Sequence, residues 1–169
     1  MPSSSHIRSV LPESSDEIKL IAERMLATLV EVLGEEQSRS MYTLDDAIQR
    51  VMWHLTSNEV VAEVFVVENT NGSILGHTIV RIDDDGEGQE IGLFGTTYVI
   101  PTERNTGVAS SLLLRGEKWM VSKGMNQAVT YTEKNNTKLQ NLYRNHGYTM
   151  SPMPKDFVKL AKALAANHD

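Results

Sequence analysis

The sequence of 169 residues contains no cysteine and no long apolar run. The absence of cysteine excludes disulfides, a cysteine nucleophile and thiolate metal ligands. No apolar stretch approaches the length that crosses a bilayer, and the polar segment Met1–Arg8 lacks the apolar core of a signal peptide. Length and composition indicate a single domain over residues 1–169, and we expect a cytoplasmic protein without a membrane partner.

The chain has a modest excess of acidic residues, with 16 Lys and Arg against 22 Asp and Glu and a formal charge of −6. A net negative domain is a poor partner for phosphate backbones, so we expect no nucleic-acid partner. The same charge favours cationic small molecules through long-range attraction. Mild acidity also serves solubility by itself, and both interpretations stay open.

The first part of the chain predicts a short strand and a helix. Residues 7–11 are expected to form the strand. Ser14 and Glu17 then have the spacing of a capping box. Apolar residues recur at helical spacing after this point, and Gly34 is expected to stop the helix.

A second helix is expected to begin at Thr43, with Asp46 three residues further on. This helix contains His54, which has no ligand partner one helical turn away. We therefore interpret His54 as a packed or exposed histidine rather than a metal ligand.

The middle of the chain changes to the period of two that is typical of strands. The runs 64–67, 74–82 and 91–100 predict three consecutive strands. Asn69–Gly72 joins the first two, because Asn-Gly is a strong hairpin signal. Gly95 inside the third run predicts a β-bulge or a close approach of the backbone to another group.

Helix and strand alternate in the remaining chain. Residues 108–123 predict an amphipathic helix, 128–132 a strand and 136–146 a second helix. The crossover through the first of these helices should place its two flanking strands parallel. The tail after Phe157 fits either a helix or a strand. This order indicates a protein of the α/β class in the broad sense. Its sheet is mixed, as in α+β proteins, and helices lie on its faces.

The segment between the third strand and the following helix carries the most chemical information. It contains Arg104, Gly107 and Ala109, and it follows Pro101. A glycine here lets the backbone approach a ligand closely, and the unpaired N–H groups of a helix start bind phosphate. The segment lacks the Gly-Lys-Ser/Thr of a Walker loop and the three glycines of a dinucleotide fingerprint. Taken alone, it fits an ordinary strand-to-helix connection equally well.

Two motifs together resemble the GNAT superfamily of N-acetyltransferases. Arg104, Gly107 and Ala109 match the family pattern [Gln/Arg]-x-x-Gly-x-[Gly/Ala], between a Val-x-Pro strand end and a Leu-Leu helix. The helix with Asn136 and Tyr143, which runs into a Gly-Tyr pair, resembles the family's Asn…Tyr…Gly-Phe helix. The order and separation of the two motifs are those of the family.

The resemblance covers residues 7–147 and implies a GNAT-like fold. In that fold a central, mostly antiparallel, twisted sheet is flanked by helices, and the tail near Phe157 is a strand. The resemblance also implies an N-acetyltransferase that moves an acetyl group from acetyl-CoA to a primary amine. The amine would attack directly in a ternary complex, without a metal.

The resemblance assigns roles to individual residues. Thr97 and Val99 would pair with the pantetheine arm, and the N–H of Thr97 would polarise the thioester carbonyl. Tyr143 matches the acid that protonates the departing thiolate, and Asn136 matches a contact to the pantetheine or a helix cap. The groups that would hold the CoA pyrophosphate are the charge of Arg104 and the backbone N–H groups of Asn105, Thr106, Gly107, Val108, Ala109 and Ser110.

Some of these assignments have simpler alternatives. Asn136 is also a good N-cap, and Tyr143 shares a helical face with apolar residues that would pack it. Leu93 stands where many family members place a glutamate base. Deprotonation is therefore expected through ordered water, with Glu90 as a catalytic helper. The remaining candidates for a base are Glu133 and His77.

The acceptor is expected to be a small-molecule or peptide amine, bound in a groove shaped by residues 18–55 and the loops near Asp83 and Ser151. A non-catalytic acyl-CoA-binding module is an alternative that the missing glutamate favours. An acetyltransferase acting on aminoacyl-tRNA is a second alternative, and the negative charge counts against it. The sequence leaves a homodimer open.

Overall fold

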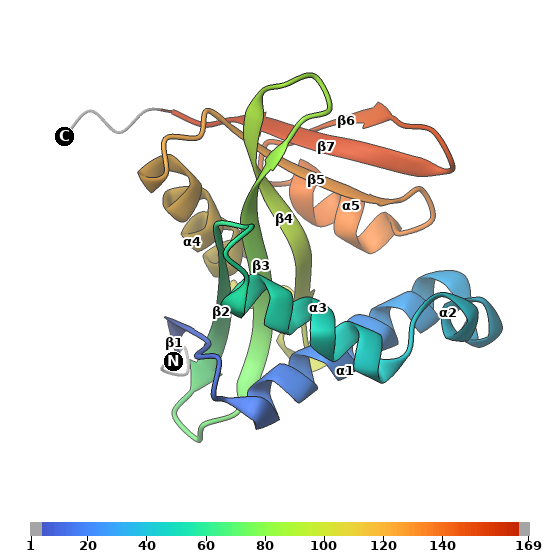
Figure 1. Ribbon diagram of the computed structural model, residues 1–169, viewed down its shortest axis with the longest axis vertical. Coiled ribbons are helices and arrows are strands. Elements are labelled where there is room, and N and C mark those ends of the chain that lie inside the picture. Colours follow the sequence, from blue (N-terminus) through green and yellow to red (C-terminus); the bar gives the residue numbers. More distant parts are fainter. Residues whose placement is uncertain (1–4, 166–169) are drawn as a thin grey trace.

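The computed structural model describes residues 5–165 of the chain (Figure 1). Its centre is a seven-stranded sheet with the order β1-β2-β3-β4-β5-β7-β6. β4 and β5 are parallel, and the other neighbouring strands are antiparallel. The strands are β1 (Ser5–Ser9), β2 (Ala62–Asn69), β3 (Ile74–Asp84), β4 (Glu90–Val99), β5 (Gln127–Glu133), β6 (Thr149–Pro152) and β7 (Phe157–Ala163).

Helices cover both faces of the sheet. They are α1 (Ser15–Leu33), α2 (Glu35–Met41), α3 (Leu44–Thr56), α4 (Val108–Ser122) and α5 (Thr137–Arg144). A 3-10 turn, Pro101–Glu103, follows β4. This architecture confirms the expected α/β fold with a mixed, mostly antiparallel sheet. It also confirms the tail as a strand.

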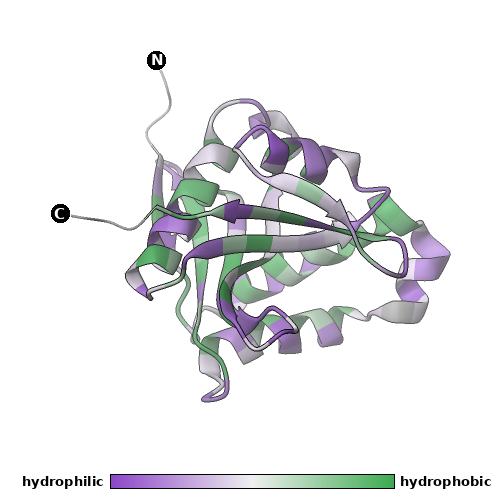
Figure 2. Ribbon diagram, turned by 90° about the horizontal axis from the view of Figure 1, so that it is seen from above, coloured by the Kyte–Doolittle hydropathy of each residue, from purple (hydrophilic) through white to green (hydrophobic). Residues whose placement is uncertain are grey.

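The alternation of β2 divides its apolar side chains between two cores. Val64 and Val66 pack with α1 and α3 on one face of the sheet. Phe65 and Val67 pack on the other face, in the cluster that contains α4 and Tyr143 of α5. Figure 2 shows hydrophobic residues on the central strands between these helices. A strand buried on both faces needs apolar residues at consecutive positions, which explains the unbroken run 64–67.

Three local predictions about secondary structure are wrong. The chain between β1 and β2 has three helices rather than two, because Gly34 with φ of 85° ends α1 and also begins the short helix α2. The strand β6 was not expected. Its residues are all exposed, so they lack the apolar alternation that marks a strand. The first strand begins and ends two residues earlier than expected.

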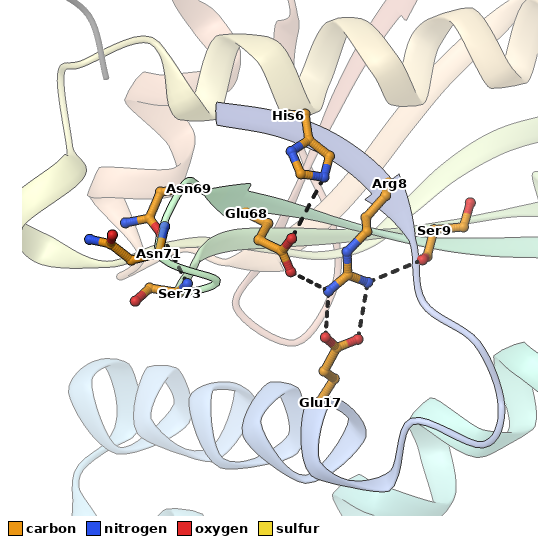
Figure 3. A network of polar contacts seen from close by, with 8 residues as sticks. All are labelled: His6, Arg8, Ser9, Glu17, Glu68, Asn69, Asn71 and Ser73. Atoms are coloured by element: carbon orange, nitrogen blue, oxygen red, sulfur yellow. Dashed lines mark hydrogen bonds and ion pairs between the residues drawn. The ribbon is translucent and has the colours of Figure 1, made fainter. Parts of the chain in front are cut away.

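The predicted capping box at Ser14 does not form, because its glutamate is used elsewhere. The side chain of Ser14 makes no cap hydrogen bond. Glu17 instead binds the guanidinium of Arg8 on β1, which also donates to Glu68 on β2 at 2.7 Å (Figure 3). These contacts tie the start of α1 to the edge of the sheet. A capping box does form between Thr43 and Asp46, where the second helix was expected to begin.

The divergence of β4 and β5 determines where a ligand can enter. The two strands pair only along Gly92–Phe94 and Ala128–Thr130, although β4 continues to Val99 and β5 to Glu133. In Figure 1 β5 and β7 run crosswise over the end of the β2–β4 ribbon. The second half of β4 therefore has β3 on one side and a gap on the other.

Candidate functional site

A cavity of about 790 Å³ occupies the gap between β4 and β5. Its walls come from α1, α3, both strands, the loop before α4, and α5. Because α1 and α3 lie on one face of the sheet and α5 on the other, the cavity reaches both faces where the strands separate. This volume is in the range of small-molecule sites.

The edge of β4 that faces the gap has free backbone groups. A register shift between Ile79 and Val80 of β3 leaves Gly95 as the extra residue of a β-bulge, as predicted. The N–H of Ile100 donates to Leu75 of β3. Backbone groups of a strand alternate in direction, so the N–H groups of Thr97 and Val99 point away from β3 and toward the gap.

The loop before α4 presents a second set of free donors. Gly107 has φ of 97° and Asn105 has φ of 67°. No backbone acceptor in the described chain takes a hydrogen bond from the N–H groups of residues 105–110. A side chain added at Gly107 would meet no atom within 4 Å of its Cβ, so the space beside the loop is open. Such a helix start binds anions.

Arg104 and Ser110 are held in place at either end of this loop. The Nε of Arg104 donates to the Val99 carbonyl at 3.1 Å, and its guanidinium lies 5.9 Å from the centre of the Tyr98 ring. Ser110 bonds Nε2 of His146 at 2.7 Å, which links α4 to the residues that follow α5. The sequence did not single out His146. The contact depends on the packing of two helices that lie far apart in the chain.

Asn136 caps α5 and also lies at the cavity wall. Its Oδ1 accepts from the Leu139 N–H at 3.3 Å, so it caps α5. Its Nδ2 donates to the Thr132 hydroxyl of β5 at 3.3 Å, and the residue also lines the cavity. The cap therefore fixes an amide side chain at the cavity wall.

Tyr143 lies behind the cavity wall and is connected to it through Thr97. The Tyr143 ring is buried against Phe94 and Tyr148, and the residue does not line the cavity. Its hydroxyl is 2.9 Å from Oγ1 of Thr97, which does line the cavity. Burial raises the pKa of the Tyr143 hydroxyl well above its ordinary value, so this group stays protonated.

The direction of this hydrogen-bond chain follows from its last acceptor. Thr78 donates to the Thr96 carbonyl at 3.1 Å, so it accepts from Thr97, 2.8 Å away. Thr97 has one proton to donate and therefore accepts from Tyr143. The hydroxyl of Tyr143 is thus a donor to the one threonine side chain that separates it from the gap.

The candidate bases lie in different environments. Leu93 lines the cavity at the position expected for a glutamate, whereas Glu90 is exposed at the first residue of β4 and does not line it. Glu133 at the end of β5 lines the cavity. His77 is fully buried without a hydrogen-bond partner, and burial lowers its pKa to about 3. Among these residues, Glu133 is the one with a carboxylate at the cavity.

Three polar residues lie on the α3 side of the cavity, of which the sequence analysis interpreted His54 as a packed or exposed histidine and did not single out Arg50 or Arg81. Arg50 and His54 lie one helical turn apart on α3, and Arg81 lies on β3. His54 donates from Nδ1 to the Arg50 carbonyl at 2.8 Å, and its Nε2 accepts from Nη1 of Arg81 at 3.0 Å. Burial, and the charges of both arginines, lower the pKa of His54 to about 4. The imidazole is therefore neutral at physiological pH.

Protein stability is expected to fall as the pH falls from 6.5 toward 4, in part because of His54. The folded-state pKa of about 4 lies below the ordinary value of 6.5, so the unfolded chain binds this proton first. Urea unfolding of the wild type and of His54→Gln at pH 7 and pH 5 measures the contribution. The decline should be smaller in the variant than in the wild type and in the exposed-site control His6→Gln. Equal declines would contradict the assignment.

The described residues offer neither a metal site nor a spanning helix. Within residues 5–165 no three His, Asp or Glu side chains are grouped so that they could hold a metal ion. No helix in that range is long and apolar enough to cross a membrane.

Two solved structures with this fold hold coenzyme A or acetyl-CoA. A Thermoplasma acidophilum N-acetyltransferase in complex with coenzyme A superposes with a TM-score of 0.72 at 17% identity, covering 95% of this chain and 99% of its own. A Salmonella typhimurium protein with its cofactor acetyl-CoA superposes with a TM-score of 0.71 at 19% identity, covering 98% of this chain and 96% of its own. At these identities the likeness establishes the shared fold.

Sequence comparison gives the family. A mycothiol acetyltransferase from Thermobispora bispora is 27% identical over 132 residues, which are 75% of this chain but 42% of that relative. The chain thus matches less than half of the relative's length. The family model described as Acetyltransferase (GNAT) family matches residues 22–148, which include both motifs and the whole gap between β4 and β5. The chain therefore belongs to the acetyltransferase (GNAT) family.

Proposed function

We propose that the protein transfers an acetyl group from acetyl-CoA to a primary amine by direct attack in a ternary complex. The observation that carries this proposal is the cavity at the divergence of β4 and β5. Its walls lie on both faces of the sheet, so a donor and an acceptor can enter from opposite sides and meet at the edge of β4.

Two sets of free N–H groups suit the two polar parts of acetyl-CoA. Residues 105–110 at the start of α4 would hold the pyrophosphate, with Arg104 adding positive charge. The N–H of Val99 would hydrogen-bond the pantetheine arm, as a neighbouring strand does, and the N–H of Thr97 would face the thioester end of the same arm. The 790 Å³ cavity is large enough for a ligand that fills the gap between strands.

The backbone of β4 can stabilise the charge that develops during transfer. When the amine attacks the thioester, the carbonyl oxygen becomes negative. The N–H of Thr97 is fixed by the pairing of β4 with β3 and can donate to that oxygen. A fixed donor needs no reorganisation as the charge grows. No acyl-enzyme is proposed, since the chain has no cysteine.

Thr97 and Tyr143 together can serve the leaving group. As the C–S bond breaks, the Thr97 hydroxyl would turn its proton from Thr78 toward the thiolate and donate it there. Thr97 would in turn take the proton of Tyr143, from which it already accepts a hydrogen bond. The tyrosine is reprotonated with the proton that the amine releases through solvent.

Leu93 stands where many family members place a glutamate base, and its side chain cannot accept a proton from the amine. We propose that ordered water takes this proton, because Glu90 lies outside the cavity. Glu133 is the carboxylate that such water can reach from the cavity wall. The acceptor itself would enter between α1 and α3.

Saturation with acetyl-CoA is expected to stabilise the fold. A ligand present at one hundred times its Kd, which binds only the folded state, adds about 2.7 kcal/mol to the free energy of unfolding. Thermal unfolding with acetyl-CoA and, as a control, with NAD measures the effect. A rise in Tm with acetyl-CoA and none with NAD supports the proposal. No rise with acetyl-CoA, or a larger rise with NAD, contradicts it.

A further inference from the structure

The acceptor side of the cavity has a polar wall, formed by Arg50, His54 and Arg81, which we call the arginine wall. Arg81 is fixed on two sides: Nε donates to Asp83 at 3.0 Å and Nη1 donates to His54 at 3.0 Å. Its side chain is 15% exposed, so little of it is free to move into solvent. A guanidinium held in this way keeps one orientation at the cavity.

Arg50 adds a positive charge that the described chain does not neutralise. Within residues 5–165, no carboxylate lies within 4.0 Å of the Arg50 guanidinium. Its partner is the Trp53 ring, 4.6 Å from the guanidinium carbon to the ring centre. The flat guanidinium therefore rests on an aromatic face and keeps its N–H donors for another group.

The remaining charges of the cavity do not cancel this excess. Glu31 is paired with Lys138 at 2.6 Å, and Asp83 is used by Arg81. Glu133 lines the cavity from β5, and its contact within the described chain is the Thr132 hydroxyl at 3.2 Å. Arg104 adds a third guanidinium at the loop before α4, so within the described residues the lining has three guanidiniums, one of them paired with Asp83, against one unpaired carboxylate on β5.

We infer that the acceptor is an amine that also carries a carboxylate, which Arg50 and Arg81 bind. This inference rests on the proposed function and names the class of its acceptor. It also replaces the cationic acceptor that the net charge of the chain favours. For a bound ligand, the charges of the cavity wall matter more than the net charge of the chain. The wall is in contact with the ligand, whereas the other charges are farther away and are screened by salt.

The position of the arginine wall fits an acceptor with its amine and carboxylate close together. A Cβ added at Gly95 would lie 3.3 Å from Nη1 of Arg81 and 4.0 Å from Nε2 of His54. The wall thus adjoins the bulge, next to the stretch of β4 proposed to hold the thioester. A carboxylate bound there leaves an amine a few bonds away beside the reacting carbonyl, as in an α-amino acid.

The charges of Arg50 and Arg81 also favour the deprotonated amine, which matters because position 93 is a leucine and not a glutamate base. A nearby positive charge disfavours the protonated form of an amine and lowers its pKa. Two guanidiniums at the carboxylate end therefore increase the fraction of neutral, nucleophilic amine at neutral pH. His54 acts as a positioning residue, because its neutral Nε2 holds Arg81 toward the cavity.

Matched acceptors test the inference. Initial rates with acetyl-CoA are measured for each standard L-amino acid, its amide and the amine that lacks the carboxyl group. O-Phosphoethanolamine and ethanolamine test whether another anion suffices. At least one amino acid should exceed its own amide and amine in kcat/KM by roughly 10- to 100-fold, the range for a lost hydrogen bond to a charged group.

The variant Arg50→Gln should remove this preference, mainly by raising KM for the amino acid while kcat changes little. It should also move the acidic limb of the kcat profile, which reports the bound amine, to higher pH, so kcat values are compared on the plateau of the profile. Arg39→Gln is the matched control, because Arg39 is exposed on α2, outside the cavity, and should change neither property.

Each outcome decides between the claims. Transfer to amines with equal or greater rates for the amides or the decarboxylated amines overturns the inference and leaves the proposed function standing. A preference for phosphate over carboxylate also overturns the carboxylate class. A carboxylate preference that persists in Arg50→Gln overturns the assigned site. No transfer to any amine by a protein that binds acetyl-CoA overturns both claims.

Discussion

The Gly107→Glu variant is expected to bind acetyl-CoA at least about 100-fold more weakly than the wild type. Gly107 opens α4 beside the free N–H groups of residues 105–110, and the space next to its Cα is empty. A glutamate there would place bulk and negative charge where the pyrophosphate is proposed to lie. Two lost hydrogen bonds to a charged group, at about 1.5 kcal/mol each, account for this factor. Isothermal titration measures the affinity.

Backbone strain must be separated from this loss of binding. Gly107 has φ of 97°, a conformation that disfavours any residue with a Cβ. Gly124→Glu is the matched control, because Gly124 has φ of 84°, follows the same helix at its other end and also has open space around it. Both variants should lose a similar amount of stability, but the control should keep its affinity. Unchanged affinity in a folded Gly107→Glu protein would show that this loop is not the phosphate site.

The Tyr143→Phe variant is expected to lower kcat by about 10²- to 10⁴-fold, the usual range for a lost general acid. The ring packs between Phe94 and Tyr148, and phenylalanine keeps that packing. The change removes the hydroxyl that donates to Thr97, so the free energy of unfolding should fall by about 1 kcal/mol. The affinity for acetyl-CoA should change little, because the proton is needed only when the thiolate leaves.

Thr97→Val tests the other half of the same path. Valine keeps the β-branched shape and the backbone N–H of this position but lacks the hydroxyl that joins Tyr143 to the cavity. If the proton passes through both hydroxyls, the two single variants and the double variant should have similar kcat values. A Tyr143→Phe protein with normal turnover would show that Tyr143 only packs the core.

Local sequence signals predicted the parts of the fold that depend on neighbouring residues. Gly95 was expected to mark a bulge and does so, because a glycine in a strand has few other uses. Asn136 was expected to begin a helix and caps α5. The Ser14–Glu17 spacing did not give a capping box, because Arg8 on β1 binds the carboxylate of Glu17. A pattern of four residues contains no information about a contact with a residue outside it that forms only in the folded structure.

The same limit explains what the sequence missed in the site. The loop that is proposed to hold the pyrophosphate lies in one continuous segment, so Gly107 and Arg104 could be identified together. Arg50, His54 and Arg81 come from two elements separated by a strand and a turn. Nothing in their spacing predicts that they meet, because the cavity exists only where β4 and β5 separate. Their common position at the cavity follows from the three-dimensional structure alone.

The most direct test of the proposed function is amine-dependent release of CoA thiol from acetyl-CoA. The chain has no cysteine, so a thiol-reactive dye reports only the CoA that is set free. With a panel of primary amines, the account predicts thiol release that requires both protein and amine and that matches the acetylated amine formed. A protein that binds acetyl-CoA but releases thiol no faster with any amine than in buffer would contradict it and indicate a non-catalytic acyl-CoA-binding module.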